Sequence, residues 1–355
     1  MSGPSRRSGR DSRDCLPDNT RTTPPVHPQH LSLLRCPATG ASLELSDAVL
    51  EDGRIRSGRL VPAGDDGSLS YPIVNFIPRF VSSDNYAQNF GFEWNLHART
   101  QYDSESGHNV SEERLSRFTG WPGELQGELV LEAGSGSGRF TEPLLRTGAT
   151  VISFDYSDAV EANEKSNGTN PNLLLVQADI YTMPFPEQLF DRVLCYGVLQ
   201  HTPDPERAFK ALVTMLKPGG HLATDIYLKS LTYYWLNTRY WVRPLTRGMD
   251  SERLYRWCKG YVSLMWPLVR LLRHLPDGQA IIWRLLVADP IDDMPSADDA
   301  TLREWAILDT FDMLSPSFDL PQTPAIFERW HRDCDLDHID VRLGSNGVAG
   351  TARRR

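Results

Sequence analysis

VLEAGSGSGRF, residues 130–140, is the stretch of sequence that decides the fold. An apolar run ends there in three glycines at alternate positions, which predicts a buried strand that turns into a helix. Glycine at such a turn permits positive φ and carries no Cβ, so the backbone can pass close beneath a ligand. A dinucleotide loop would read G-x-G-x-x-G and a P-loop would end in Gly-Lys-Ser/Thr, and neither pattern is present. The E-x-G-x-G-x-G form suits a ligand with a cationic or zwitterionic head, although Gly-Ser repeats alone are also typical of linkers.

Short apolar runs alternate with helical patterns on the C-terminal side of this loop. Asp155 ends one run and lies 21 residues after Gly134, about where a βαβ unit places a carboxylate for a ribose diol. Ala208 and Leu212 repeat at helical spacing after Asp204 and a proline, which predicts a helix start. The alternation indicates an α/β fold with a parallel sheet. The apolar runs after the loop are 151–155, 173–176, 193–196 and 222–225, the last preceded by a turn at 217–220.

Residues 110–226 together resemble the class I S-adenosylmethionine-dependent methyltransferases of the seven-stranded type. The resemblance implies a doubly wound, mostly parallel seven-stranded sheet with an antiparallel last strand, and S-adenosylmethionine as cofactor. It implies that the glycine loop holds the methionine part, that Asp155 binds the ribose and Tyr156 the adenine, and that Asp179 and Ile180 read and cover the adenine. Strand-end N-caps for the two acids and a core position for Tyr156 remain alternatives. The expected cofactor-binding residues are Glu132, Gly134, Ser135, Gly136, Gly138, Asp155, Tyr156, Asp179, Ile180 and Tyr196.

The segments outside residues 110–226 predict further helices and strands and several additional units. The last part of the chain predicts a helix, a half-exposed strand over 336–343 and a last edge strand over 347–353 that runs antiparallel to the others. An aromatic stretch over 89–94 either folds over the cofactor, as the resemblance implies, or serves packing. The predicted units are a disordered tail at 1–30, a small β-rich ribbon-like module at 31–80, a helical lead-in at 81–126, the cofactor-binding core at 127–226, a helical insertion or lid at 227–319 after strand five, and the completing helix and strands at 320–355.

The N-terminal module resembles the small zinc-ribbon-like unit found at the front of some methyltransferases. A zinc ribbon needs paired C-x-x-C ligands, but Thr39 stands where a partner of Cys36 would be, so we expect no metal. The arginine-rich tail lacks the hydrophobic centre of a secretory signal. Five scattered cysteines suit a reducing compartment, which favours a cytoplasmic location.

The insertion divides into two parts of opposite charge. Residues 227–289 carry ten Lys and Arg against four Asp and Glu, whereas residues 292–319 carry eight acids against Arg303 alone. Basic and aromatic helices predict either a lid packed on the core or a surface for a membrane, an anionic lipid or single-stranded nucleic acid, with Arg239, Arg243 and Arg247 as candidate surface cations. A net charge of −9 disfavours broad binding to nucleic acid.

The residues that follow strand four are the best candidates for chemistry. His201 is expected at the carboxyl edge of the sheet and is a candidate general base, although a helix-start histidine without a catalytic role is an equal alternative. Gln200, Asp309 and Asp312 are candidates for contact with the acceptor. We predict direct methyl transfer to a small-molecule or lipid-like acceptor, with contact to a membrane surface as a further alternative. The sequence is also compatible with an RNA methyltransferase and with a non-catalytic protein that keeps the fold for binding.

Overall fold

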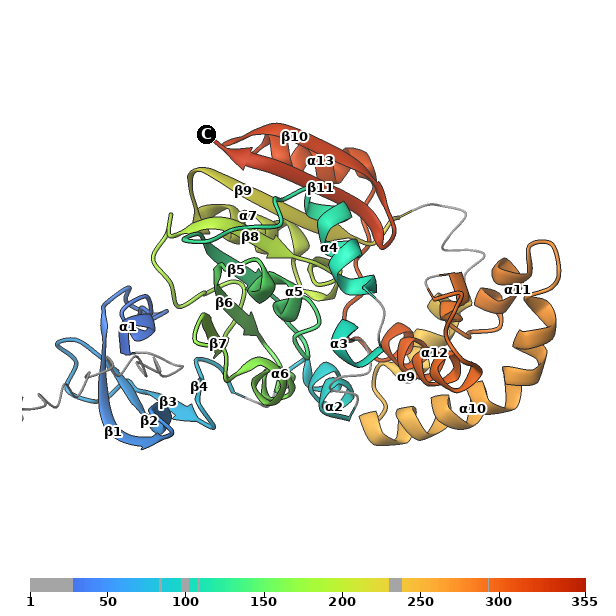
Figure 1. Ribbon diagram of the computed structural model, residues 1–355, viewed down its shortest axis with the longest axis horizontal. Helices are drawn as coiled ribbons and strands as arrows, with labels where there is room; N and C mark the ends of the chain where they lie inside the picture. The colour runs from blue at the N-terminus through green and yellow to red at the C-terminus, as the bar shows by residue number, and fades with distance from the viewer. Residues whose placement is uncertain (1–27, 83–84, 97–101, 107–108, 230–237, 293) are drawn as a thin grey trace, which may run out of the picture.

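A seven-stranded sheet forms the centre of the protein in the computed structural model, which describes residues 28–82, 85–96, 102–106, 109–229, 238–292 and 294–355 (Figure 1). Strands β5 to β9 pair in parallel, and β11 is antiparallel to β9 and β10. The order is β10-β11-β9-β8-β5-β6-β7, which confirms the predicted fold class. The strands are β5 Leu129–Ala133, β6 Thr150–Asp155, β7 Leu173–Gln177, β8 Phe190–Cys195, β9 Leu216–Ile226, β10 Leu336–Gly344 and β11 Gly347–Arg354.

Two details of the sheet differ from the sequence prediction. Strand β11, expected at the edge, lies between β9 and β10, because the chain turns back at Gly347 and the returning strand pairs on both sides. A Cβ at Gly347 would lie 2.5 Å from the carbonyl oxygen of Ile226, so the turn needs glycine. The turn expected at 217–220 lies inside β9, where the register shifts between the pairs Phe190–Leu216 and Arg192–His221.

Helices cover both faces of the sheet. Val130 and Val151 pack on one face under α4 Val110–Thr119, α5 Thr141–Arg146 and α6 Val160–Asn167. Their neighbours Leu131 and Ile152 pack on the other face under α7 Pro205–Met215 and α13 Pro324–Arg332. Successive side chains of a strand point to opposite faces, so a strand buried on both faces is apolar throughout, as the runs in the sequence are. The N-cap of α7 is Asp204, whose carboxylate accepts from the Arg207 N–H, as predicted.

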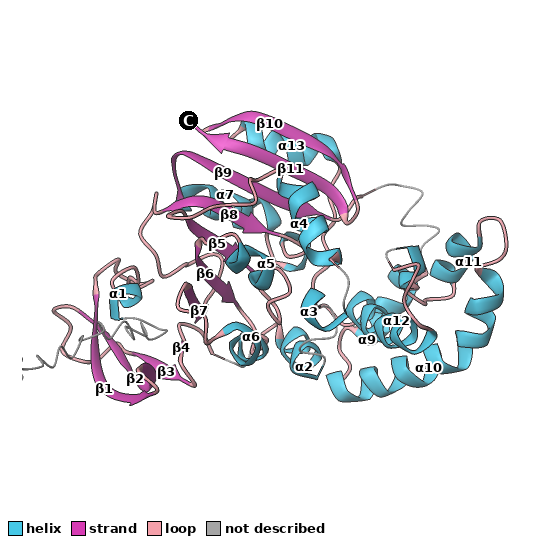
Figure 2. Ribbon diagram, viewed as in Figure 1, coloured by secondary structure: helices cyan, strands magenta, loops and turns pink. Residues whose placement is uncertain are grey.

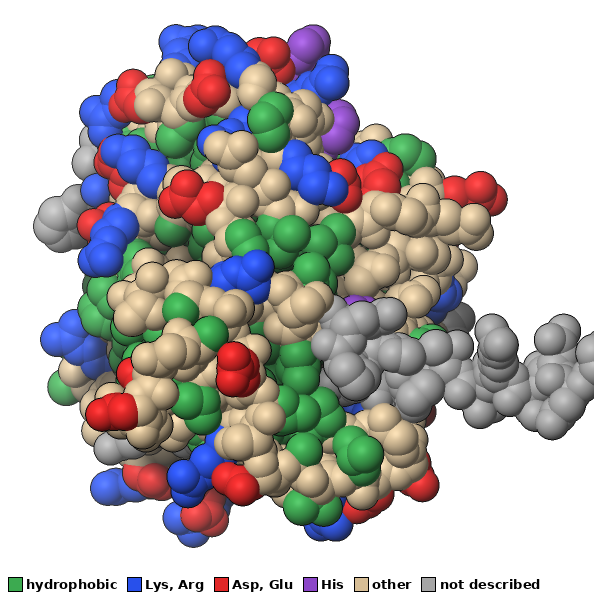
Figure 3. Space-filling view, turned by 90° about the vertical axis from the view of Figure 1, so that its left-hand side faces the viewer, with side chains coloured by type: hydrophobic (Ala, Val, Ile, Leu, Met, Phe, Trp, Pro, Cys, Tyr) green, Lys and Arg blue, Asp and Glu red, His purple; other side chains and the backbone are tan. Residues whose placement is uncertain are grey.

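The N-terminal module is a separate antiparallel sheet of β1 Leu43–Glu51, β2 Arg54–Pro62, β3 Tyr71–Val74 and β4 Ile77–Pro78. The predicted tail lies outside the described residues up to residue 27, and its last residues belong to α1 Pro28–Leu31. The Arg79 guanidinium joins the module to the core through Glu161 at 2.6 Å and Gln177 at 2.9 Å. Within the described ranges, no group of three His, Cys, Asp or Glu could hold a metal ion. Figure 3 faces this side and shows hydrophobic side chains near its centre, with basic and acidic side chains interspersed around them.

A group of helices follows β9 and lies beside the sheet at the right of Figure 2. It consists of α9 Arg239–Thr246, α10 Ser251–Leu272, α11 Gly278–Arg284 and α12 Asp299–Leu314, with a core of its own around Val262, Trp266 and Trp305. Two lead-in helices, α2 Gln88–Leu96 and α3 Asp103–Ser106, lie between this group and the sheet (Figure 1). Of the described helices, none is long and apolar enough to cross a bilayer.

Two of the candidate surface cations in this group are buried. Arg239 and Arg243 are 6% and 7% exposed and face Asp319, with the Arg243 Nη1 atom 3.4 Å from the carboxylate. The Arg243 guanidinium also donates to the carbonyl oxygens of Met313 and Pro316, at 3.2 and 2.8 Å. The alternative in which these two arginines lie on an exposed basic surface is therefore contradicted, since Asp319 faces both of them and backbone carbonyl groups accept from Arg243.

Candidate functional site

A cavity of about 400 Å³ opens at the carboxyl ends of the parallel strands. Its floor comes from the loops that follow β5, β6 and β8, and its walls come from the lead-in helix α2 and the insertion helices α11 and α12. In open parallel sheets, ligands bind at this edge because the connecting loops diverge there. The glycine loop, the β6 acid and the post-β8 segment, all singled out in the sequence, therefore meet in one place.

The glycine loop bends sharply beneath this cavity. Gly134 has φ +77°, and a Cβ there would lie 2.2 Å from a methyl carbon of Val198. The N–H groups of Gly134 and Ser135 both donate to the carbonyl oxygen of Phe154, at 2.8 and 3.0 Å. A phosphate-binding loop would direct such groups at its ligand. The internal pairing agrees with the sequence argument that this loop does not hold a polyphosphate.

Asp155 links the loop to the end of β6. Its Oδ2 atom accepts from the Gly136 N–H at 2.9 Å, and its Oδ1 atom accepts from the N–H and hydroxyl of Ser157 at 2.8 and 2.7 Å. Burial raises the pKa of this carboxyl, and the same hydrogen bonds oppose the shift. A carboxylate oxygen accepts two hydrogen bonds, so Oδ2 retains capacity for a hydroxyl donor.

Aromatic rings complete this end of the cavity. The rings of Tyr156 and Tyr86 lie 4.8 Å apart between centroids, and Ile180 lines the same wall. A carboxylate beside flat apolar surfaces fits a nucleoside, whose ribose offers hydroxyl donors and whose base offers a π-face. The residues present therefore fit the adenosine part of S-adenosylmethionine.

Four of the predicted site residues do not line the cavity. Glu132 is 3% exposed and accepts hydrogen bonds from the hydroxyls of Thr141 and Ser153. Burial raises its pKa to about 7. The others are Gly138, Gln200, which is fully buried, and Asp179, whose carboxylate accepts from the Tyr181 N–H. Glu132 therefore supports the glycine loop through Thr141 and Ser153. Contact of Glu132, Gly138, Asp179 and Gln200 with a ligand stays a prediction.

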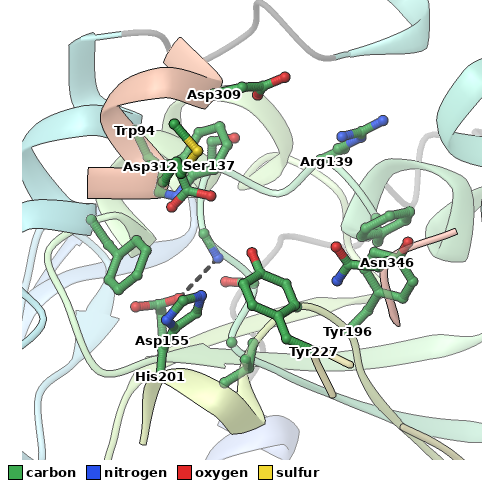
Figure 4. A pocket seen from close by; sticks show the side chains of 18 of the residues that line it. Trp94, Ser137, Arg139, Asp155, Tyr196, His201, Tyr227, Asp309, Asp312 and Asn346 are labelled. Carbon is green, nitrogen blue, oxygen red and sulfur yellow. Dashed lines mark hydrogen bonds between the residues drawn. The ribbon is translucent and has the colours of Figure 1, made fainter. Parts of the chain in front are cut away.

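His201 and Asp312 line the cavity on the side of the insertion (Figure 4). The His201 Nδ1 atom lies 2.9 Å from the carbonyl oxygen of Phe318. A carbonyl only accepts, so Nδ1 carries the proton and Nε2 remains the basic nitrogen. The imidazole also meets the ring of Tyr227 edge-on, at 5.4 Å. Burial raises the pKa of Asp312, while the neighbouring His201 and Arg243 side chains oppose that shift.

The far side of the cavity contains residues that sequence reasoning did not single out as site residues. Arg139 and Asn346 lie there, apart from His201 and Tyr227 (Figure 4). The Arg139 Nε atom donates to the Ser111 hydroxyl at 3.0 Å, and burial with the nearby Arg114 charge lowers its pKa to about 10. Asn346 donates to Asp225 at 2.7 Å, and burial raises the pKa of that acid to about 7.

Other cavity residues had a partial signal in the sequence. Phe90 and Trp94 belong to the aromatic stretch at 89–94, and both line the cavity from α2. The Trp94 indole nitrogen lies 3.3 Å from the position of a Cβ on Gly136, so this ring covers the glycine loop. Tyr196 and Asp309, both predicted, also line the cavity. Tyr227 directly follows β9, where the end of a parallel strand could have pointed to it.

Comparisons with known proteins agree with this geometry. Residues 131–224 match the family described as "Methyltransferase domain". The ubiquinone biosynthesis O-methyltransferase of Pseudomonas fluorescens is 30% identical over 138 residues, which cover 37% of this chain and 59% of that protein. The enzyme of the same name from Acinetobacter baumannii is 29% identical over 151 residues, which cover 40% of this chain and 62% of that protein. The chain thus spans about three fifths of the length of these curated relatives.

A solved structure of a SAM-dependent methyltransferase from Methanosarcina mazei is 16% identical, with a TM-score of 0.38 and coverage of 68% of this chain and 96% of that one. The family match, residues 131–224, begins within β5 and ends within β9, and so includes the glycine loop, Asp155 and much of the cavity floor. The chain therefore contains a methyltransferase domain, to which residues 131–224 belong.

Proposed function

We propose that this protein binds S-adenosylmethionine and transfers its methyl group to a small, lipid-like acceptor. The observation that carries the proposal is the single cavity in which the glycine loop, Asp155 and His201 meet. When bound, S-adenosylmethionine supplies an electrophilic methyl group on a sulfonium. The protein's part is to align the acceptor with that methyl and to exclude water.

The residues that would hold the cofactor lie along the sheet edge. Asp155 would accept from the ribose hydroxyls, because Oδ2 has one hydrogen bond in the structure and room for another. Tyr156 and Ile180 would flank the adenine, and Gly136 would let the methionine chain pass close to the loop. Trp94 would cover the cofactor from α2 and keep water from the reacting atoms.

The acceptor would lie between His201 and α12. Cavity side chains there are mainly aromatic or apolar, among them Phe90, Tyr227 and Met313, which suits an acceptor with an apolar body. An oxygen acceptor must lose a proton as it attacks, and the His201 Nε2 atom is the base available for it. The relatives are named O-methyltransferases, which supports a hydroxyl acceptor here. Asp312 would accept a hydrogen bond or stabilise the imidazolium.

Two earlier alternatives have less support from the geometry. Of the three arginines considered for an RNA-binding surface, Arg239 and Arg243 are buried and face Asp319, and Arg247 alone is exposed. A non-catalytic binding protein would not need a base beside the methyl position. A cytoplasmic location stays part of the proposal, supported by the free thiols of the cysteines within the described residues.

Isothermal titration with S-adenosylmethionine, followed by a transfer assay, tests the proposal. Incubation with methyl-labelled cofactor and a lipid extract is expected to label an organic-soluble product, which mass spectrometry would identify by the added CH₂. Failure to bind the cofactor would end the enzymatic interpretation. Cofactor binding with label only in RNA would refute the lipid-like acceptor.

A further inference from the structure

Helix α10 carries apolar side chains on two faces. One face is buried against the insertion and includes Leu254, Val262 and Val269. The second face points away from this core. Its members recur at alternate spacings of four and three residues, which places them on one stripe of a helix. They are Trp257, Tyr261, Leu264, Leu268, Leu271 and, just beyond the helix end, Leu275; we call them the outer stripe.

Five of the six residues of the outer stripe are exposed, and Tyr261 is half-buried against the core of the insertion. Leu264 and Leu271 are 78% and 63% exposed, and Trp257, Leu268 and Leu275 are between 40% and 49% exposed. The Trp257 and Tyr261 rings are stacked, with centroids 5.0 Å apart and planes 4° apart. Single exposed leucines are common on protein surfaces, but a continuous apolar stripe marks an interaction site. The stripe extends about 27 Å at 1.5 Å per residue, so it suits a broad surface.

Basic side chains accompany the outer stripe. The exposed Arg253, Arg256 and Lys259 lie on α10, together with Arg270, whose exposed guanidinium is 3.6 Å from Asp299. Helical geometry at 100° per residue places Arg253 at the margin of the stripe and Arg256 on its flank, whereas Lys259 and Arg270 lie about 140° to 160° from its centre. The only acid of α10 is Glu252 in its first turn. An apolar stripe with a basic flank and aromatic residues is typical of helices that lie in the surface of an anionic membrane.

We propose that the outer stripe of α10 docks the protein on the surface of an anionic lipid bilayer. The charge distribution favours a membrane over a second copy of the chain. In a twofold dimer the stripe would meet itself, and Arg253 and Arg256 of both copies would lie near the same interface, where α10 offers Glu252 as its one acid. An anionic headgroup layer instead offers negative charge beside an apolar interior.

The cavity adjoins the docked side. Helix α11 follows α10, and its Trp283 both lines the cavity and is 41% exposed. The Tyr261 hydroxyl donates to the carbonyl oxygen of Leu285 at 2.5 Å, which ties the outer stripe to the end of α11. Both helices lie at the margin of the molecule, away from the sheet (Figure 1). Docking would thus bring the cavity wall to the bilayer, where an apolar acceptor is dissolved; this consequence rests on the proposed function.

Vesicle sedimentation of the full chain tests the docking itself. The wild type is expected to sediment with vesicles of phosphatidylcholine and phosphatidylglycerol, more weakly with phosphatidylcholine alone, and less as salt rises. The double variant Leu264→Glu/Leu271→Glu is expected to bind at least about tenfold more weakly, because two leucines no longer enter the apolar layer. Both side chains are exposed, so the fold should be unaffected. The matched control is Leu50→Glu, at a leucine 64% exposed on β1.

The outcomes separate this proposal from the proposed function. No binding of the wild type to anionic vesicles, or equal binding of wild type and double variant, would overturn the docking. A dimer in light scattering that the double variant abolishes, without vesicle binding, would instead assign the stripe to a second copy. Titration with S-adenosylmethionine needs no membrane and should give the same affinity for both proteins. Loss of vesicle binding with intact cofactor affinity therefore supports docking, whereas absent cofactor affinity would count only against the enzymatic proposal.

Discussion

Glu132 makes the stability of this fold depend on pH in a way that one substitution can isolate. Its carboxyl is 3% exposed, and burial raises its pKa from 4.5 to about 7 against the hydrogen bonds of Thr141 and Ser153. The folded state therefore binds this proton more tightly than the unfolded chain does. Its contribution to the free energy of unfolding is fully present below about pH 4.5 and is lost as pH rises towards about 7. A shift of about 2.5 units corresponds to about 3 kcal/mol.

Glu132→Gln removes the titration and keeps the shape. The amide oxygen can accept from the same two hydroxyls that now donate to Oε2, at 2.5 and 2.8 Å. Urea unfolding at pH 5 and pH 8 would be compared between variant and wild type. Other groups, among them Asp225, titrate equally in both proteins and cancel in the difference. We expect the variant to gain about 2.5 kcal/mol over the wild type between the two pH values, because a small part of the effect is already lost at pH 5.

The control is Glu113→Gln, at a side chain 69% exposed on α4, which should leave the pH dependence unchanged. Parallel stability curves for Glu132→Gln and the wild type would refute the reasoning. They would mean that the buried carboxylate is ionised throughout, and that the two hydroxyls compensate for its burial.

Three further changes test the cavity. Asp155→Ala should weaken binding of S-adenosylmethionine by about 30-fold in calorimetry, because charge-assisted hydrogen bonds to the ribose are lost. The control Ser157→Ala removes only a hydrogen-bond partner of the same carboxylate and should change the affinity little. His201→Ala should lower kcat by about 100-fold at unchanged cofactor affinity, and normal turnover would remove His201 from catalysis. Gly134→Ala should destabilise the domain by about 2 kcal/mol or more in urea unfolding, because φ is +77° and the new Cβ overlaps Val198. Adding Val198→Ala should restore the part of the unfolding free energy that the overlap removes. If it restores none, the contact between the new Cβ and Val198 is contradicted.

The sequence predicted the elements whose formation depends on residues close together in the chain. The α7 start was readable because Asp204 caps the helix with its own carboxylate and Pro205 occupies the first turn. The buried runs of β5 and β6 were readable because both of their faces are covered. The place of β11 was not, because insertion between β9 and β10 depends on pairing with residues more than a hundred positions away. Alternation in β10 indicates half-burial and says nothing of the neighbouring strand.

The same distinction separates the site residues. The glycine loop and Asp155 follow strand ends, and the carboxyl ends of parallel strands meet at one edge, so their convergence could be predicted. Trp94 and Asn346 reach the cavity from α2 and from the turn between the last strands, and only tertiary packing brings them there. Glu132 matched a motif by position, yet its carboxyl turns towards Thr141 and Ser153 and does not line the cavity.

The basic excess of the insertion is the sum of two unlike populations, which composition alone could not separate. Arg243 is directed inward and is neutralised by Asp319 and backbone carbonyls, so it stabilises the packing of α9 on the end of α12. Arg253 and Arg256 are exposed and lie beside the outer stripe. The lid and the membrane surface, weighed as alternatives on sequence, can therefore be two faces of one helical group. The inner face closes the cavity through α12, and the outer face of α10 is available to lipid.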